Sequence, residues 1–149
     1  MLDAVRCSSS HPLQSIFPLL KNSGASATLV EPGAIFSFDH LLLAAALAEK
    51  SIKDGTAVSD RPEMEFLLWL ACTPHAKKAI GLAGAKSEKD FVLVVLGDGK
   101  KGAPNARALA KKLGLDENKK NHIGSETALS FFSVSSAELL YEKMALSRL

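Results

Sequence analysis

The chain has 149 residues, 47% hydrophobic and 23% charged, which is the composition of one globular domain and excludes disordered and collagen-like chains. Its two cysteines are too few for the disulfide framework of a small secreted protein. The net charge is only +2, but residues 77–120 hold eleven basic and five acidic side chains. This part could bind a polyanion, although a solvated lysine surface is the simpler interpretation.

Neither a leader nor a membrane span is visible in the pattern of apolar residues. No basic flank followed by an apolar run comes after Met1. The longest apolar stretches, 41–48 and 66–72, are far shorter than the roughly 20 residues that cross a bilayer. We therefore expect a cytoplasmic protein that makes no membrane contact and folds as a single domain over residues 1–149.

The beginning of the chain predicts two strands with a short helix between them. Residues 2–7 and 27–30 are expected to be strands. The helix is expected to start at Pro12, because proline favours the first turn. Pro18 is expected to bend or end it, because proline has no backbone N–H to donate.

The next part predicts three helices. Ser37 is the N-cap candidate of the clearest one and Gly55 its stop signal. This helix is apolar on most sides from 41 to 48, so it should be buried or covered by a partner. Pro62 opens the second helix, and the pair Thr73-Pro74 opens a third that ends near Gly84.

The last part predicts strands and helices in alternation. The valine-rich run 91–96 reads as a central strand, and 104–113 as an amphipathic helix. Residues 127–134 look like a strand, and Ser135 with Glu138 forms a capping box before the final helix. Since the elements do not follow a regular βαβ order, we predict an α+β fold with several helices around a small mixed or antiparallel sheet.

Residues that could carry chemistry are few. The four histidines have no partner at a metal-ligand spacing, apart from His75 three residues after Cys72, and no second such pair exists. As a nucleophile and base, Cys72 and His75 would still lack a third, orienting group. We therefore expect no metal, no cofactor and no catalytic residues.

One glycine-rich segment supports an alternative function. Residues 97–102 fit the pattern G-x-G-x-x-G between a strand and a helix. A nucleotide-binding enzyme is therefore one hypothesis for the function, as an alternative to the one given below. In the dinucleotide fingerprint the helix begins inside the glycine motif. Here Pro104 favours a later start, and a solvated turn is the simpler interpretation.

Three blocks of the chain carry a more specific signal. They are SFDHLLLAAALA at 37–48, EFLLWLA at 65–71 with Thr73, Ala79 and Gly84-Ala85 after it, and AELLYEKMAL at 137–146. In this order and spacing the chain resembles the small kinase-binding subunit family of the KEOPS complex, the family of the PRPK-binding protein, over about residues 25–149. Where that family often opens the third helix with a glutamine and an isoleucine, this chain has His75-Ala76.

The resemblance implies a function in transfer RNA modification. KEOPS helps to install threonylcarbamoyl on the adenosine beside the anticodon of certain transfer RNAs, through an ATPase-fold transferase on which a small atypical kinase sits. The family resembled here binds the kinase N-lobe, promotes its activity and grips the transfer RNA 3′ tail, with no known catalytic site of its own. A generic interaction module unrelated to transfer RNA is the third hypothesis.

The kinase contact is expected on the apolar sides of the helices 37–50 and 136–149, because exposed apolar helix faces usually mark partners. Leu43 and Leu146 are the candidate residues. For each of them a plain core position is an equally good interpretation.

The transfer RNA contact is expected on the second and third helices. A single-stranded tail is held by cations along its phosphates and by a flat side chain under a base. The candidate cations are Arg61, Lys77, Lys78 and Lys86, and the candidate shelf is Trp69. The alternatives are a core anchor for Trp69, a solvated face for the lysines, and an RNA site formed by Lys100, Lys101, Arg107, Lys111 and Lys112.

Overall fold

A computed structural model describes residues 1–97, 104–118 and 122–148 of the chain. It confirms the α+β class, because helices pack on both faces of an open antiparallel sheet. In chain order the elements are β1 Leu2–Ser8, α1 Leu13–Asn22, β2 Ala27–Val30, a 3-10 turn at Pro32–Ala34, α2 Phe38–Lys53, α3 Pro62–Leu70, α4 Ala76–Ala83, β3 Phe91–Leu96, α5 Ala106–Lys112, β4 Asp116–Glu117, α6 Thr127–Phe131 and α7 Ala137–Leu146.

The sheet has the strand order β2-β3-β1-β4, and each neighbouring pair is antiparallel. The strand β3 is central, as its valine-rich sequence predicted. Val94, for example, lies opposite Ala4 of β1 on one side and Thr28 of β2 on the other.

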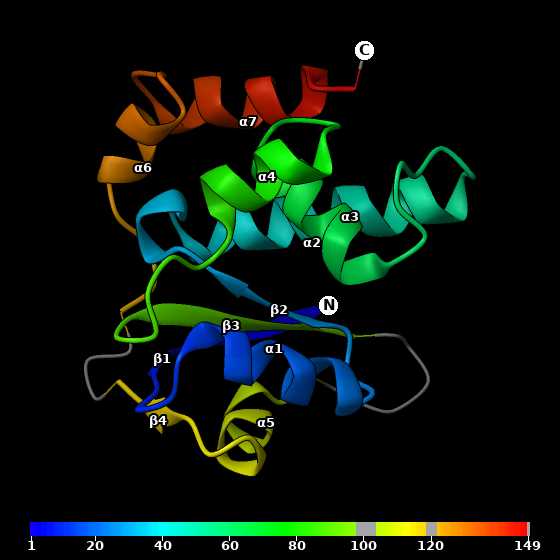
Figure 1. The fold of residues 1–149 in the computed structure, drawn as a ribbon. Coiled ribbons are helices and arrows are strands. Elements are labelled where there is room, and N and C mark those ends of the chain that lie inside the picture. The colour runs from blue at the N-terminus through cyan, green and yellow to red at the C-terminus, as the bar shows by residue number, and fades with distance from the viewer. Residues whose placement is uncertain (98–103, 119–121, 149) are drawn as a thin grey trace.

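Both faces of β3 are buried, and this explains its unbroken apolar run. Val92 and Val94 belong to one hydrophobic cluster, and Phe91, Leu93 and Val95 belong to another on the opposite face. Figure 1 shows α1 and α5 on one side of the sheet and α2, α3 and α4 on the other, with α7 outermost. We call the first side the α1/α5 layer and the second, with α6 and α7 included, the α2/α7 layer.

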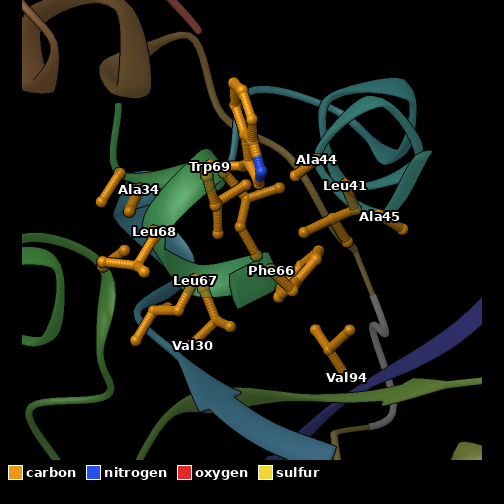
Figure 2. Close-up of a cluster of buried hydrophobic side chains, with 14 of the residues drawn as sticks. Val30, Ala34, Leu41, Ala44, Ala45, Phe66, Leu67, Leu68, Trp69 and Val94 are labelled. Carbon is orange, nitrogen blue, oxygen red and sulfur yellow. The ribbon is translucent and has the colours of Figure 1, made fainter. Parts of the chain in front are cut away.

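The core of the α2/α7 layer is built on α3. Figure 2 shows Phe66 and Leu67 of α3 pointing toward Val94 and Val30 of the sheet, while Trp69 rises from the opposite side of the helix. The α2 residues Leu41, Ala44 and Ala45 complete this contact and are buried. A helix apolar on most sides, such as α2, is thus largely covered by its own neighbours.

Most helix boundaries follow the predicted signals. The Ser37 side chain accepts a hydrogen bond from the backbone N–H of His40, which caps α2, and Gly55 follows the helix with φ +74°. Two helices begin two residues later than predicted. The helix α4 begins at Ala76, and α5 begins at Ala106 with Asn105 as its N-cap.

Of the two outcomes expected at Pro18, a bend or an end of the helix, the end is wrong, because α1 continues to Asn22 with the proline inside it. The missing N–H deprives only the Gln14 carbonyl of its donor. Both residues lie on the exposed side of the helix, where water can replace that bond. Ile16 and Leu20, which are buried against the sheet, hold the helix across the proline.

The predicted strand 127–134 is also wrong, since this segment contains the short helix α6. Ala128 and Phe132 are buried four residues apart, which is the spacing of one helix face. The prediction of a capping box formed by Ser135 and Glu138 is wrong, because the N-cap is Ser136 and the residue three positions after it is Leu139. Ser136, rather than Ser135, caps α7 by accepting a hydrogen bond from the N–H of Leu139 at 3.3 Å.

Candidate functional site

The helix α7 is tied to the N-terminal part of α2. Its residues Leu140 and Met144 are buried in the α2/α7 layer. At the start of α2, the hydroxyl of Ser37 lies 3.3 Å from that of Tyr141. One side of α7 is therefore part of the core, and the other faces solvent.

The solvent side of α7 carries two large apolar residues. Leu139 and Leu146 are 44% and 51% exposed, and their spacing of seven residues places them along one line of the helix. Both line a hollow of about 460 Å³ together with Val134 and Lys143. The candidate Leu146 is thus at the surface, whereas the candidate Leu43 is half-buried and packs against the core.

Exposed apolar residues on α2 lie elsewhere than sequence analysis placed them. Phe38 and Leu42 are 40% and 41% exposed and one helical turn apart. The sequence alone does not distinguish the half-buried Leu43 from the exposed Leu42, because the whole run 41–43 is leucine.

A buried carboxylate is the main polar feature of the α2/α7 layer. Glu65 of α3 is 0% exposed, and both of its oxygens accept hydrogen bonds. Four groups donate to it, namely the Ser51 hydroxyl at 2.8 Å, the Val58 and Ser59 N–H groups at 3.1 and 3.0 Å and the Trp69 indole at 3.1 Å, and Arg148 forms an ion pair with it at 2.9 Å.

Arg148 supplies the positive charge of this cluster. Its side chain is 12% exposed, and its guanidinium lies 4.4 Å from the centre of the Trp69 ring. Because its Nε and Nη2 make no well-directed hydrogen bond, an ion pair and a cation–π contact hold it. Burial acts to raise the pKa of Glu65, but the Ser59 N–H, the Ser51 hydroxyl and Arg148 together lower it below its usual value.

Sequence analysis did not identify this cluster. The signal that could have found it is that Glu65 is the one charged residue of the run 64–72. A lone carboxylate in an apolar helix must find donors when the helix is buried. Its partners at 51, 58, 59 and 148 lie too far along the chain for any local pattern to name them.

Trp69 lies in the core and not on an open face. It is 7% exposed, its indole N–H donates to Ser51 and Glu65, and Arg148 lies over its ring. This placement fits the alternative of a core anchor. A base could stack on the indole only after Arg148 had moved.

Two of the candidate cations lie beside one hollow of about 660 Å³. This hollow is lined by Ser59 and Asp60 on one side and by Ala76 on another, so Arg61 and Lys77 follow its lining residues directly. Both cations are exposed, and so is Lys78 in the same turn of α4. Arg61 also pairs with Glu63 at 2.9 Å, an exposed contact of small energetic weight.

Lys86 lies apart from the other candidate cations. Its ammonium is 4.9 Å from the centre of the Phe131 ring, and its backbone N–H donates to Glu31. In Figure 1 the segment after α4 runs on the side of α6, away from the start of α3. The hollow thus links the loop before Arg61 to the start of α4, which carries Lys77 and Lys78, whereas Lys86 lies beside Phe131.

Most of the glycine-rich segment 97–102, with Lys100 and Lys101, lies outside the described residues. The start of the following helix is described, and its first N–H, that of Ala106, donates to the carboxylate of Asp3 at 2.7 Å. A nucleotide phosphate at this helix start would compete with that carboxylate. Nucleotide binding gains no support from this arrangement.

His40 is a buried, neutral side chain beneath α7. Its Nδ1 accepts a hydrogen bond from the N–H of Phe36, and its ring lies 5.8 Å from that of Phe132 and 6.5 Å from that of Tyr141. Burial lowers its pKa to about 4, against the opposing effect of the Leu70 backbone. At neutral pH this histidine is a structural residue.

The two thiols are poor nucleophiles. Burial raises the pKa of Cys7 to about 12 and that of Cys72 to about 11, so little thiolate exists at neutral pH. Within residues 1–97, 104–118 and 122–148, no three His, Cys, Asp or Glu side chains gather as metal ligands would. In the same residues no helix is long and apolar enough to cross a membrane.

Comparison with known proteins adds no relative to this picture. No protein-family model matches the chain, and no curated protein matches it. Hypotheses about its function therefore rest on the arrangement of residues described above and on the resemblance of the three sequence blocks.

Proposed function

We propose that this chain is a non-catalytic, cytoplasmic subunit of the KEOPS complex that binds and activates the small atypical kinase and grips the 3′ end of transfer RNA. The observation that carries the proposal is the line of exposed leucines on α7, Leu139 and Leu146. It lies in the third of the sequence blocks that resemble the kinase-binding family, residues 137–146.

The exposed leucines favour a protein partner for physical reasons. Two large apolar side chains that are about half exposed line one hollow, and exposed apolar groups gathered in this way usually mark interaction sites. The hollow can accept an apolar anchor from the partner, which is how a few residues come to dominate an interface. Its rim carries Glu142 and Lys143, so charges of both signs are available to orient the partner.

Support for the RNA contact comes from the second hollow. Arg61 and Lys77 directly follow residues that line it, Lys78 comes next in α4, and all three are exposed, as phosphate-binding cations must be. Since Trp69 is covered, the proposal relies on the cations and not on the indole. Lys86 lies beside Phe131 and Glu31 instead of the lining of this hollow, and it is left out of the proposed RNA site.

Co-purification with a KEOPS-type kinase tests the proposal. The two proteins expressed together should elute as one complex in size-exclusion chromatography. This complex should bind intact transfer RNA more tightly than it binds transfer RNA that lacks its 3′ tail. Failure of the folded chain to associate with the kinase would contradict the kinase-binding role. Equal affinity for intact and truncated transfer RNA would contradict the grip on the tail.

A further inference from the structure

The two oxygens of Glu65 hold different parts of the molecule. Oε1 lies within bonding distance of Ser51, Trp69 and Arg148, which belong to the helical body of the α2/α7 layer. Oε2 accepts the N–H groups of Val58 and Ser59, which belong to the loop 54–61 between α2 and α3. This one carboxylate thus joins Arg148, two residues after the end of α7, to a loop about ninety positions earlier in the sequence.

The middle of the loop depends on this carboxylate. At its start, the Thr56 N–H donates to the Ser51 carbonyl, and at its end the Arg61 N–H donates to the Ser59 hydroxyl. Between these points Val58 is 55% exposed, so apolar burial contributes little there. The hydrogen bonds of Val58 and Ser59 to Glu65 are therefore what fixes this part of the loop.

The carboxylate in turn depends on Arg148. A fully buried charge is costly unless a counter-charge and hydrogen bonds compensate it. Without Arg148 the Glu65 side chain would tend to bind a proton or turn toward water. A neutral carboxyl is a weaker acceptor than a carboxylate, so the two N–H groups that the loop directs at Oε2 would be held less strongly.

We propose that Arg148 is a positioning residue that acts through Glu65 to hold the loop 54–61 in place, so that the end of α7 and this loop move as one unit. In the proposed function, on which this consequence rests, a kinase that binds at Leu146 meets α7 two residues before Arg148. The loop lines the hollow beside which Arg61 and Lys77 lie. Kinase binding and RNA binding are then linked through the pair Arg148–Glu65.

Hydrogen exchange of the full chain, without kinase or RNA, tests whether Arg148 holds the loop 54–61 in place. In Arg148→Met the amides of Val58 and Ser59 should exchange about tenfold faster or more, while those of β3 keep their rates, because only the loop is released. Trp69 is the only tryptophan of the chain, so its emission should shift to longer wavelength as the covering guanidinium is lost. Arg107→Met, which removes an exposed arginine from the α1/α5 layer, is the matched control and should change neither signal.

A double variant shows whether Arg148 acts through Glu65. In a Glu65→Gln background the loop has already lost its carboxylate, so Arg148→Met should accelerate the Val58 and Ser59 amides little further. Arg148→Lys keeps a cation without the planar fork and should give a smaller acceleration, which covers the case in which Arg148→Met does not fold. Amide exchange rates at Val58 and Ser59 that stay unchanged in the Arg148 variants, or that rise in parallel with those of β3, would contradict the positioning role of Arg148. Either result would leave the proposed function untouched.

Discussion

The two helical layers use the same sheet in different ways. In the α1/α5 layer the helices meet the strands through apolar residues such as Ile16 and Leu109, and the ion pair Arg107–Glu117 stays at the surface with side chains 66% and 41% exposed. In the α2/α7 layer polar groups enter the core. The buried polar side chains in the described part of the chain are His40, Ser51, Glu65 and Thr73, and all of them belong to this layer.

This difference separates what the fold needs from what the proposed function needs. The α1/α5 layer shows that helices can cover this sheet without buried charge. Buried ion pairs are costly to desolvate and are weak evidence for stability. The α2/α7 layer, which contains such a pair, also borders the two hollows beside Leu146 and beside Arg61 and Lys77. We infer that its polar core serves the positioning of binding surfaces.

The largest expected contrast is between a buried and an exposed glutamate that each pair with an arginine, Glu65 and Glu117. Glu65→Ala should lower the free energy of unfolding by about 3–5 kcal/mol, because it leaves the buried Arg148 and four other donors without their acceptor. Glu117→Ala removes the exposed pair with Arg107 and should cost less than about 1 kcal/mol. Urea unfolding of both variants measures this, and equal losses would show that the buried pair has no special weight.

The pH dependence of stability should report on His40. Its folded pKa of about 4 lies below the unfolded value of 6.5, so its stabilising contribution is complete above pH 6.5 and is lost as the pH falls toward 4. The loss over this interval should be about 3 kcal/mol. The lowered pKa of Glu65 adds a further loss at still lower pH.

The comparison with His40→Asn isolates that contribution. Asparagine keeps an acceptor for the Phe36 N–H but does not titrate. The free energy of unfolding, measured between pH 7 and pH 4, should therefore depend less on pH in the variant than in the wild type. Equal slopes would mean that His40 takes up its proton in the folded state as readily as in the unfolded state.

Two adjacent lysine pairs, one in each layer, compare the possible RNA surfaces. The double change Lys77→Glu and Lys78→Glu should weaken transfer RNA binding roughly tenfold and reduce the slope of log K against log salt by about 1.4, since two single-strand phosphate contacts are lost. The same change at Lys111 and Lys112 of α5 should have little effect, as should Lys86→Glu alone. Loss of affinity only in the Lys111–Lys112 variant would move the RNA site to the α1/α5 layer.

The smallest expected contrast concerns how helices end in the two layers. After α5 the left-handed position is occupied by Gly114, with φ +73°, but after α6 it is occupied by Ser133, with φ 57°. Ser133→Gly should therefore stabilise the protein by about 1 kcal/mol, and Gly114→Ser should destabilise it by a similar amount. Thermal unfolding measures both, and changes of the same sign would contradict this explanation.

The sequence predicted those parts of the fold whose signals are local. The cap at Ser37, the glycine stops and the apolar run of β3 depend on neighbouring residues, and they were correct. The helix α6 was missed because Phe131 and Phe132 favour a strand. Its helical form instead buries Ala128 and Phe132, and Phe132 packs against the ring of His40, far away in the sequence.

The candidate sites were predicted less well than the fold, for a similar reason. Exposure of Leu146 agrees with the proposed kinase contact, but Leu43 and Trp69 are covered by residues far along the chain. The cluster around Glu65 was missed because its donors come from three separate segments. Local patterns indicate which side of a helix is apolar, but they do not indicate what covers it.

The most direct test of binding by the α2/α7 layer compares two leucines that are equally exposed. Leu146 on α7 and Leu19 on α1 are both 51% exposed, so a change of either to glutamate should cost the free protein little stability. Titration of a KEOPS-type kinase, followed by calorimetry, should show that Leu146→Glu raises the Kd about tenfold or more, while Leu19→Glu leaves it unchanged. An unchanged Kd for a folded Leu146→Glu variant, or an equal loss in both variants, would contradict binding through α7.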